Sequence, residues 1–167
     1  MLLPDLVATE ELARQAVARS APGDLLVLTG PLGAGKTTLT QAIARQLGST
    51  AVVTSPTYTL VHEYPTPAGP LVHIDAYRFT DASDVRRLGL EDYLERARLT
   101  VVEWGAGLLR HYPEALWLEL DFPAVTHDHS DTLKSGTPGS AGRTATWRSP
   151  AELLAADAPD DGGRSGP

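Results

Sequence analysis

The sequence predicts an α/β fold with a mostly parallel β-sheet, an antiparallel portion and flanking helices. Three observations indicate this class. Apolar runs of strand length alternate with helix-like segments along residues 9–122. A glycine-rich segment, GPLGAGKTT at residues 30–38, joins one apolar run to a helix. Two β-rich runs, 57–64 and 71–77, are separated only by the turn-forming PTPAGP, which is typical of an antiparallel hairpin.

The first elements have recognisable ends. We predict a helix over 9–20, with Thr9 as its N-cap and two acids in its first turn. The run at 24–30 is predicted to be a strand, and a helix over 36–48 follows the glycine-rich segment and ends at Gly48. The later elements are also read from apolar pattern and turn residues: strands over 57–64, 71–77, 99–104 and 116–122, and helices over 82–96 and 106–111.

The composition changes after residue 122, which suggests how the chain is organised. Residues 1–123 form the predicted folded domain. Residues 124–142 are rich in Ser, Thr, Gly, Asp and Pro and read as a flexible loop. Residues 143–156 predict a strand that returns to pair with the run at 116–122, followed by a short helix. Residues 157–167 read as a disordered tail.

Composition excludes several classes of function. The 167 residues include no cysteine, which rules out disulfides, cysteine-ligated zinc and thiol catalysis and agrees with a cytoplasmic location. No apolar run approaches the roughly 18 to 20 residues of a membrane span, and the N-terminus does not resemble a secretory signal, so we expect no membrane contact. The net charge of -7 argues against tight binding of a polyanion, so any nucleic-acid role is expected to be indirect.

The glycine-rich segment matches the phosphate-loop pattern G-x-x-x-x-G-K-[ST]. Glycines such as Gly33 and Gly35 let the backbone N–H groups approach phosphate oxygens closely. The following helix directs its positive dipole end at the same oxygens. Lys36 can reach the β- and γ-phosphates, and the Thr37 hydroxyl suits Mg²⁺. The sequence therefore predicts a P-loop NTPase fold and a nucleoside triphosphate as ligand.

Two strand-end acids are candidates for the chemistry. LVHID ends in Asp75 and LTVVE ends in Glu103, and ligands of open α/β sheets lie at the carboxyl ends of the strands. One acid is expected to hold Mg²⁺ and the other to orient the attacking water, and the residues alone do not decide which does which. The two histidines of these β-rich runs, His62 and His73, are interpreted as packed or edge residues rather than ligands.

The segment VTSPTYTL, residues 53–60, has two possible roles. It follows the phosphate-loop helix, where GTPase-like proteins keep a hydroxyl-bearing loop that responds to the γ-phosphate. Thr54, Ser55 and Thr57 would then contact Mg²⁺ or phosphate. The alternative is that Thr and Tyr are present only because they favour strands.

Taken together, five motifs resemble the TsaE (YjeE) family, small bacterial ATPases required for making threonylcarbamoyladenosine in tRNA. The resemblance covers roughly residues 5–122 and rests on LGAGKTT (32–38), SPTYTL (55–60), HIDAYR (73–78), LGLEDYL (88–94) and VEW (102–104). It implies that residues 1–123 are a P-loop ATPase domain. The family usually has Asp or Asn where this chain has Pro31, a position that need not donate to phosphate.

The resemblance implies ATP and Mg²⁺ as ligands. It assigns Thr37 and Glu103 to the metal and places Asp75 by the γ-phosphate, with Lys36 completing the catalytic set. Thr9 is implied to lie near the adenine. The remaining nucleotide contacts come from the loop: Gly33, Ala34, Gly35, Lys36, Thr37 and Thr38. The family hydrolyses ATP slowly in isolation and acts with TsaB and TsaD, so tRNA is an indirect partner.

Two rival functions stay open from the sequence. A small-molecule kinase would need an arginine-rich lid over the phosphates, and the one cluster that suits this is Arg86, Arg87, Arg96 and Arg98. These arginines lie on a predicted helix, where charged residues usually form a solvated face. A nucleotide-dependent binding module would bind ATP and partners without useful turnover.

Overall fold

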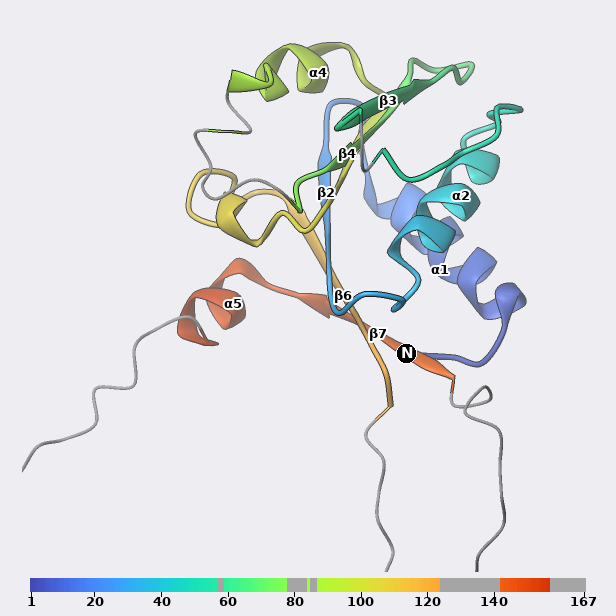
Figure 1. Ribbon diagram of the computed structural model, residues 1–167, viewed down its shortest axis with the longest axis vertical. Helices are drawn as coiled ribbons and strands as arrows, with labels where there is room; N and C mark the ends of the chain where they lie inside the picture. The colour runs from blue at the N-terminus through green and yellow to red at the C-terminus, as the bar shows by residue number, and fades with distance from the viewer. Residues whose placement is uncertain (57–58, 78–83, 85–86, 124–141, 157–167) are drawn as a thin grey trace, which may run out of the picture.

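The chain forms an α/β fold built on one seven-stranded sheet. In a computed structural model, residues 1–56, 59–77, 84, 87–123 and 142–156 are described (Figure 1). The strands of this part are β1 (Leu2–Leu3), β2 (Leu25–Thr29), β3 (Val61–Tyr64), β4 (Leu71–Asp75), β5 (Leu99–Glu103), β6 (Leu116–Asp121) and β7 (Arg143–Arg148). The helices are α1 (Leu6–Arg19), α2 (Lys36–Gln46), α4 (Leu90–Arg96) and α5 (Pro150–Ala156), with a 3₁₀ turn, η1, at Ala106–Leu108.

The centre of the sheet is parallel and its margins are antiparallel. The strand order is β1-β7-β6-β2-β5-β4-β3. Strand β2 lies between β5 and β6 and is parallel to both, and β4 is parallel to β5. Strand β3 pairs antiparallel with β4, as predicted for the hairpin, and β7 pairs antiparallel with β6 where a returning strand is predicted. The fold class expected from the sequence is therefore confirmed.

Each face of the sheet is covered by its own helices. Figure 1 shows α1 and α2 on one side and α4 and α5 on the other. Alternate side chains of β2 pack against the helices on the two faces of the sheet, because successive side chains of a strand point to opposite faces. Leu26 and Leu28 pack with α1 and α2, whereas Val27 packs with Leu90 of α4 and Leu108 of η1. Both faces of the central strands are thus buried, which is typical of parallel sheets.

The start of α1 differs from the prediction. The N-cap is Asp5, whose Oδ1 accepts a hydrogen bond from the Ala8 N–H at 2.9 Å. Thr9 lies inside the helix, and its hydroxyl donates to the Asp5 carbonyl at 3.1 Å. The prediction of Thr9 as N-cap was wrong because Asp5, an equally suitable cap one turn earlier, allows a longer helix.

Some other boundaries also shift. Helix α4 begins only at Leu90, after a turn in which Gly89 adopts φ +78°, so the described part of the predicted 82–96 helix is interrupted. Helix α2 ends as predicted, since Gly48 follows its last turn with φ +84°. The segments predicted as a flexible loop and a tail lie outside the described residues, apart from residue 142. None of the described helices has the length and apolar character needed to cross a membrane.

Candidate functional site

A cavity of about 550 Å³ lies beyond the carboxyl ends of β2, β4 and β5. This is the edge of the sheet where ligands of α/β proteins bind. The glycine-rich segment forms one wall and the ends of β4 and β5 form another. The lining residues are Leu32, Gly33, Gly35, Lys36, Thr37, Thr38, Ser55, Asp75, Tyr77, Glu103, Trp104 and Arg143.

Glycines shape the loop for two different reasons. Gly33 and Gly35 have φ values of +79° and +99°, and Gly35 is the N-cap of α2. A Cβ on Gly33 would have only the Phe122 ring nearby, at 3.9 Å, so the backbone there faces open space. Gly30, in contrast, packs on the sheet, because its Cβ would lie 1.8 Å from the Leu120 carbonyl oxygen. The loop therefore keeps a bare backbone surface in front of the N-terminus of α2, a setting that suits an anion.

Lys36 places its cation inside this loop. The side chain is only 4% exposed, and its ammonium donates to the carbonyl oxygens of Gly30 and Pro31 at 2.8 and 2.9 Å. Burial lowers the pKa of Lys36, and the charges of Glu103 and Asp75 act in the opposite direction. Backbone oxygens of the loop thus hold the ammonium, and the charges of both acids act on it there.

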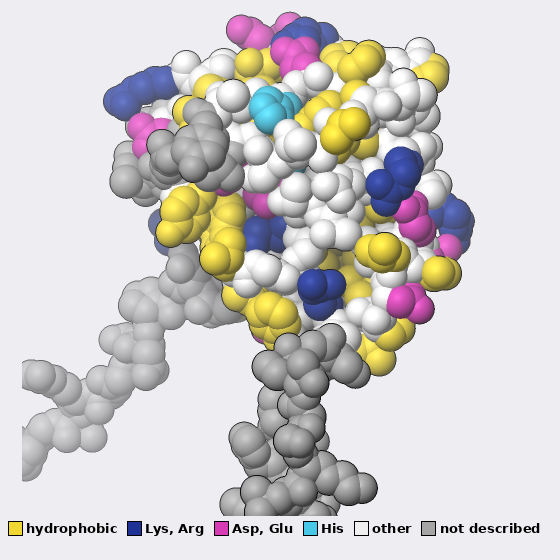
Figure 2. Space-filling model, turned by 45° about the vertical axis from the view of Figure 1, so that its right-hand side comes forward, with side chains coloured by type: hydrophobic (Ala, Val, Ile, Leu, Met, Phe, Trp, Pro, Cys, Tyr) yellow, Lys and Arg dark blue, Asp and Glu magenta, His cyan; other side chains and the backbone are white. Residues whose placement is uncertain are grey.

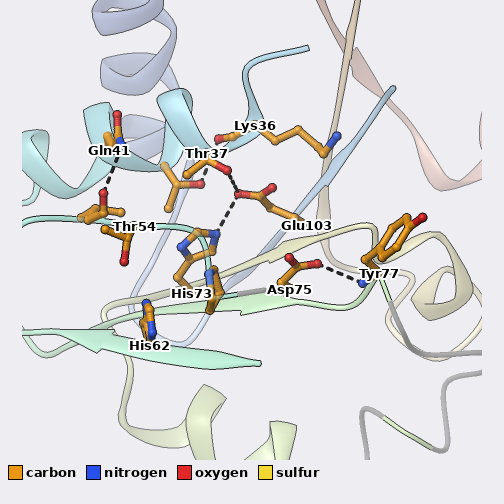
Figure 3. Close-up of polar contacts among 12 residues, drawn as sticks. Lys36, Thr37, Gln41, Thr54, His62, His73, Asp75, Tyr77 and Glu103 are labelled. Carbon is orange, nitrogen blue, oxygen red and sulfur yellow. Dashed lines mark hydrogen bonds and ion pairs between the residues drawn. The ribbon is translucent and has the colours of Figure 1, made fainter. Parts of the chain in front are cut away.

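Glu103 joins the loop helix to the sheet. Its Oε1 accepts a hydrogen bond from the Thr37 hydroxyl at 2.9 Å and lies 2.8 Å from Nε2 of His73 (Figure 3). Glu103 is 4% exposed and His73 is fully buried. A hydroxyl and a carboxylate at the phosphate-loop mouth are the oxygen donors that Mg²⁺ prefers, so this pair fits that ion.

Asp75 occupies the equivalent end of the neighbouring strand. The parallel register pairs Asp75 with Glu103, so both strand-end acids reach the same cavity. Asp75 is 5% exposed, and its Oδ1 accepts a hydrogen bond from the Tyr77 backbone N–H at 3.0 Å. This bond fixes one carboxylate oxygen and orients the acid at the end of β4.

The other candidate residues are not all brought to the cavity. Thr38 and Ser55 line it, and the backbone N–H of Ala34 donates to the Pro31 carbonyl at 3.2 Å within the loop. Thr9 is buried on α1 and does not line the cavity. Thr57 lies outside the described residues.

Two of the remaining lining residues, Tyr77 and Trp104, belong to the HIDAYR and VEW motifs, whereas Arg143 belongs to no motif of the sequence. Arg143 enters from β7, and its Nε donates to the Gly33 carbonyl at 3.3 Å. Tyr77 contacts the Trp104 ring edge to face, with the centroids 5.2 Å apart. The sequence predicts the pairing of β7 with β6, but it does not show that the Arg143 side chain reaches the loop.

The described members of the arginine cluster are engaged elsewhere. Arg87 bonds Asp84, Arg96 bonds Glu63 of β3, and Arg98 donates to the Ser20 carbonyl. None of these three lines the cavity, and Arg86 lies outside the described residues. The described arginines of this cluster therefore do not form a lid over the loop.

Comparison with known proteins identifies the family. The model of the family described as threonylcarbamoyl adenosine biosynthesis protein TsaE matches residues 3–131. A Bacillus subtilis protein named tRNA threonylcarbamoyladenosine biosynthesis protein TsaE is 42% identical over 106 residues, 64% of this chain and 66% of the relative. A Streptomyces coelicolor protein of the same name is 38% identical over 76% of this chain and 86% of its own.

A solved structure is similar to this chain over nearly the whole fold. The crystal structure of Bacillus subtilis YdiB superimposes with a TM-score of 0.65 and 28% identity, and the match covers 95% of each chain. The family match spans most of the strands and helices that build the cavity, from β1 to β6. The chain therefore belongs to the TsaE family.

Proposed function

We propose that this chain is a magnesium-dependent ATPase that supports N6-threonylcarbamoyladenosine modification of tRNA in a complex with TsaB and TsaD. One observation carries the proposal. A single cavity combines the bare phosphate loop, the buried Lys36 ammonium, the Thr37–Glu103 pair and Asp75. The names of the relatives supply the pathway.

Each residue has a role that follows from its place. The loop N–H groups and the start of α2 would bind the phosphates, and Lys36 would exchange its carbonyl partners for phosphate oxygens. Thr37 and Glu103 would hold Mg²⁺, which neutralises phosphate charge when bound. Asp75 would orient the attacking water, since its carboxylate lines the cavity and the Tyr77 N–H fixes one of its oxygens.

The contacts of the arginines favour hydrolysis of ATP over transfer of its phosphate to a metabolite. A kinase excludes water with a cationic lid, whereas Arg87, Arg96 and Arg98, the described members of the cluster, bond other parts of the fold. Arg143, which lines the cavity, bonds the Gly33 carbonyl of the loop. An indirect relation to tRNA agrees with the face of the molecule shown in Figure 2, where the described Lys and Arg side chains lie singly rather than in a broad basic patch. We therefore propose slow hydrolysis by the isolated chain and action through its protein partners.

Calorimetry on matched lysine variants tests this function. Lys36→Ala is expected to abolish measurable binding of ATP. Lys134→Ala removes the same charge at the only other lysine of the sequence and is the control. Unchanged ATP affinity in Lys36→Ala would refute the assignment of the loop. Retention of TsaB and TsaD on the immobilised wild-type chain, compared with and without ATP, tests the partner proposal separately.

A further inference from the structure

His73 is a buried polar residue without an assigned role. It lies in the middle of β4 with no exposed surface, and its Nε2 is 2.8 Å from Oε1 of Glu103. Its other nitrogen, Nδ1, has no hydrogen-bond partner among the described residues. Burying an imidazole with one nitrogen unpaired costs free energy. An apolar side chain would suit the core better, so the contact with Glu103 calls for a functional explanation.

The contact between His73 and Glu103 shows which ring nitrogen carries the hydrogen and how the carboxylate is oriented. A carboxylate oxygen only accepts hydrogen bonds, so Nε2 of His73 carries the hydrogen and donates it. The Thr37 hydroxyl donates to the same oxygen at 2.9 Å. Oε1 of Glu103 is therefore held by two donors, from β4 and from α2, and the other oxygen turns away from both (Figure 3).

We propose that His73 is a positioning residue for Glu103. Its Nε2–H holds the carboxylate in the orientation in which one oxygen meets Thr37 and the second is presented to the cavity. The inference rests on the proposed function, because Glu103 is there a ligand of Mg²⁺. Hydrogen bonds to a ligating carboxylate fix its direction, and their loss typically lowers metal affinity by about 10- to 100-fold.

A purely structural role for His73 makes a different prediction. Filling the core would affect stability, and any apolar residue of similar size would then serve. Positioning requires a donor at the Nε2 position. Gln places its amide nitrogen at a similar distance from the backbone, whereas the shorter Asn places its nitrogen where Nδ1 stands and does not reach Glu103. The His73→Gln, His73→Asn and His73→Leu variants therefore separate the two roles.

The test compares metal dependence with nucleotide binding. We would measure the Mg²⁺ concentration that gives half-maximal ATP hydrolysis, and the ATP dissociation constant in EDTA by calorimetry. His73→Leu and His73→Asn are expected to raise the Mg²⁺ requirement about tenfold or more, with ATP affinity in EDTA unchanged. His73→Gln is expected to restore most of the wild-type Mg²⁺ dependence. The matched control is His62→Leu, at the position paired with His73 on β3.

Each outcome decides between the proposals. If His73→Leu does not fold, the Asn and Gln variants make the same comparison with polar side chains. Two results would overturn the positioning role. One is a Mg²⁺ requirement in His73→Asn equal to that of the wild type, and the other is a Mg²⁺ requirement in His73→Gln as high as that in His73→Asn. Wild-type protein that binds no ATP would overturn the proposed function as well, whereas active wild-type protein confines the failure to His73.

Discussion

The ammonium of Lys36 lies 3.8 Å from the centroid of the Trp104 indole ring. A cation over an indole face is stabilised by about 0.5 to 2 kcal/mol. The ring is held there by an uncommon backbone, since Trp104 has φ +64°. Gly105 follows it, where a Cβ would lie 2.9 Å from a Val27 methyl group. The environment of the Trp104 indole therefore depends on the position of Lys36, the lysine that we assign to the phosphates.

Binding of ATP is expected to change the fluorescence of Trp104. If Lys36 moves from the Gly30 and Pro31 carbonyls to phosphate oxygens, the indole loses its cationic neighbour. A fluorescence titration with ATP checks this expectation. Trp104→Phe should abolish the change although Trp117 and Trp147 remain. Constant emission from wild-type protein that binds ATP in calorimetry would show that Lys36 does not leave the ring.

Asp75→Asn and Glu103→Gln are expected to impair hydrolysis more than binding. Phosphate release should fall by about 10²- to 10⁴-fold in Asp75→Asn, because the residue proposed to orient water loses its charge. ATP affinity should change by less than about fivefold, or 1 kcal/mol. Only Glu103→Gln should raise the Mg²⁺ requirement, which would assign the two acids separately. Normal turnover in both variants would show that neither acid takes part.

Two glycines of the loop are expected to respond differently to the same substitution. Gly30→Ala drives a Cβ to 1.8 Å from the Leu120 carbonyl oxygen, so the free energy of unfolding should fall by more than about 4 kcal/mol. Gly33→Ala meets no close atom and bears only the strain of its positive φ, about 1–2 kcal/mol. It should stay folded yet bind ATP poorly, because the methyl group occupies the bare loop surface. Urea denaturation and calorimetry on both variants check the contrast.

The sequence predicts the centre of the site better than its borders. The unit formed by β2, the loop and α2 depends on a local pattern, and Asp75 and Glu103 come together because neighbouring parallel strands end at one edge. The pairing of β7 with β6 was predicted but the role of Arg143 was not, because no local motif marks its side chain as one that reaches the cavity. The contact of His73 with Glu103 was missed for a similar reason, since a buried histidine in a strand is usually a packed residue.

Tyr64→Phe is expected to loosen the segment that precedes Ser55. The buried Tyr64 hydroxyl accepts a hydrogen bond from the Thr54 N–H at 3.1 Å and donates one to the Thr54 carbonyl at 2.9 Å. Removing it takes this partner from both backbone groups of Thr54 and from Nδ1 of His62, which lies 3.0 Å from the same hydroxyl. The free energy of unfolding should therefore fall by about 1–3 kcal/mol. Hydrogen exchange at the Thr54 amide should accelerate at the same time. Tyr112→Phe, which loses an exposed bond to Glu91, is the control and should change little.

The ion pair between Glu63 of β3 and Arg96 of α4 is expected to make stability depend on pH. Hydrogen bonds from Arg96 lower the pKa of Glu63 from its ordinary 4.5, against the effect of burial and with help from the arginine charge. A carboxyl with a lowered folded-state pKa contributes its stability above its unfolded pKa and loses it as the pH falls through the folded value. The pair is partly exposed, so its contribution near neutral pH should be about 0.2–1 kcal/mol.

A double-mutant cycle with Glu63→Gln and Arg96→Met isolates this pair from the contact of Arg96 with the Tyr93 ring. The coupling free energy from urea denaturation should be constant between pH 6 and 7, where Glu63 is charged in both states. It should decline below pH 4.5, the ordinary pKa of the carboxyl, and vanish once Glu63 is protonated in the folded chain. A coupling energy that stays constant down to pH 2 would mean that the charge of Glu63 does not stabilise the contact between β3 and α4.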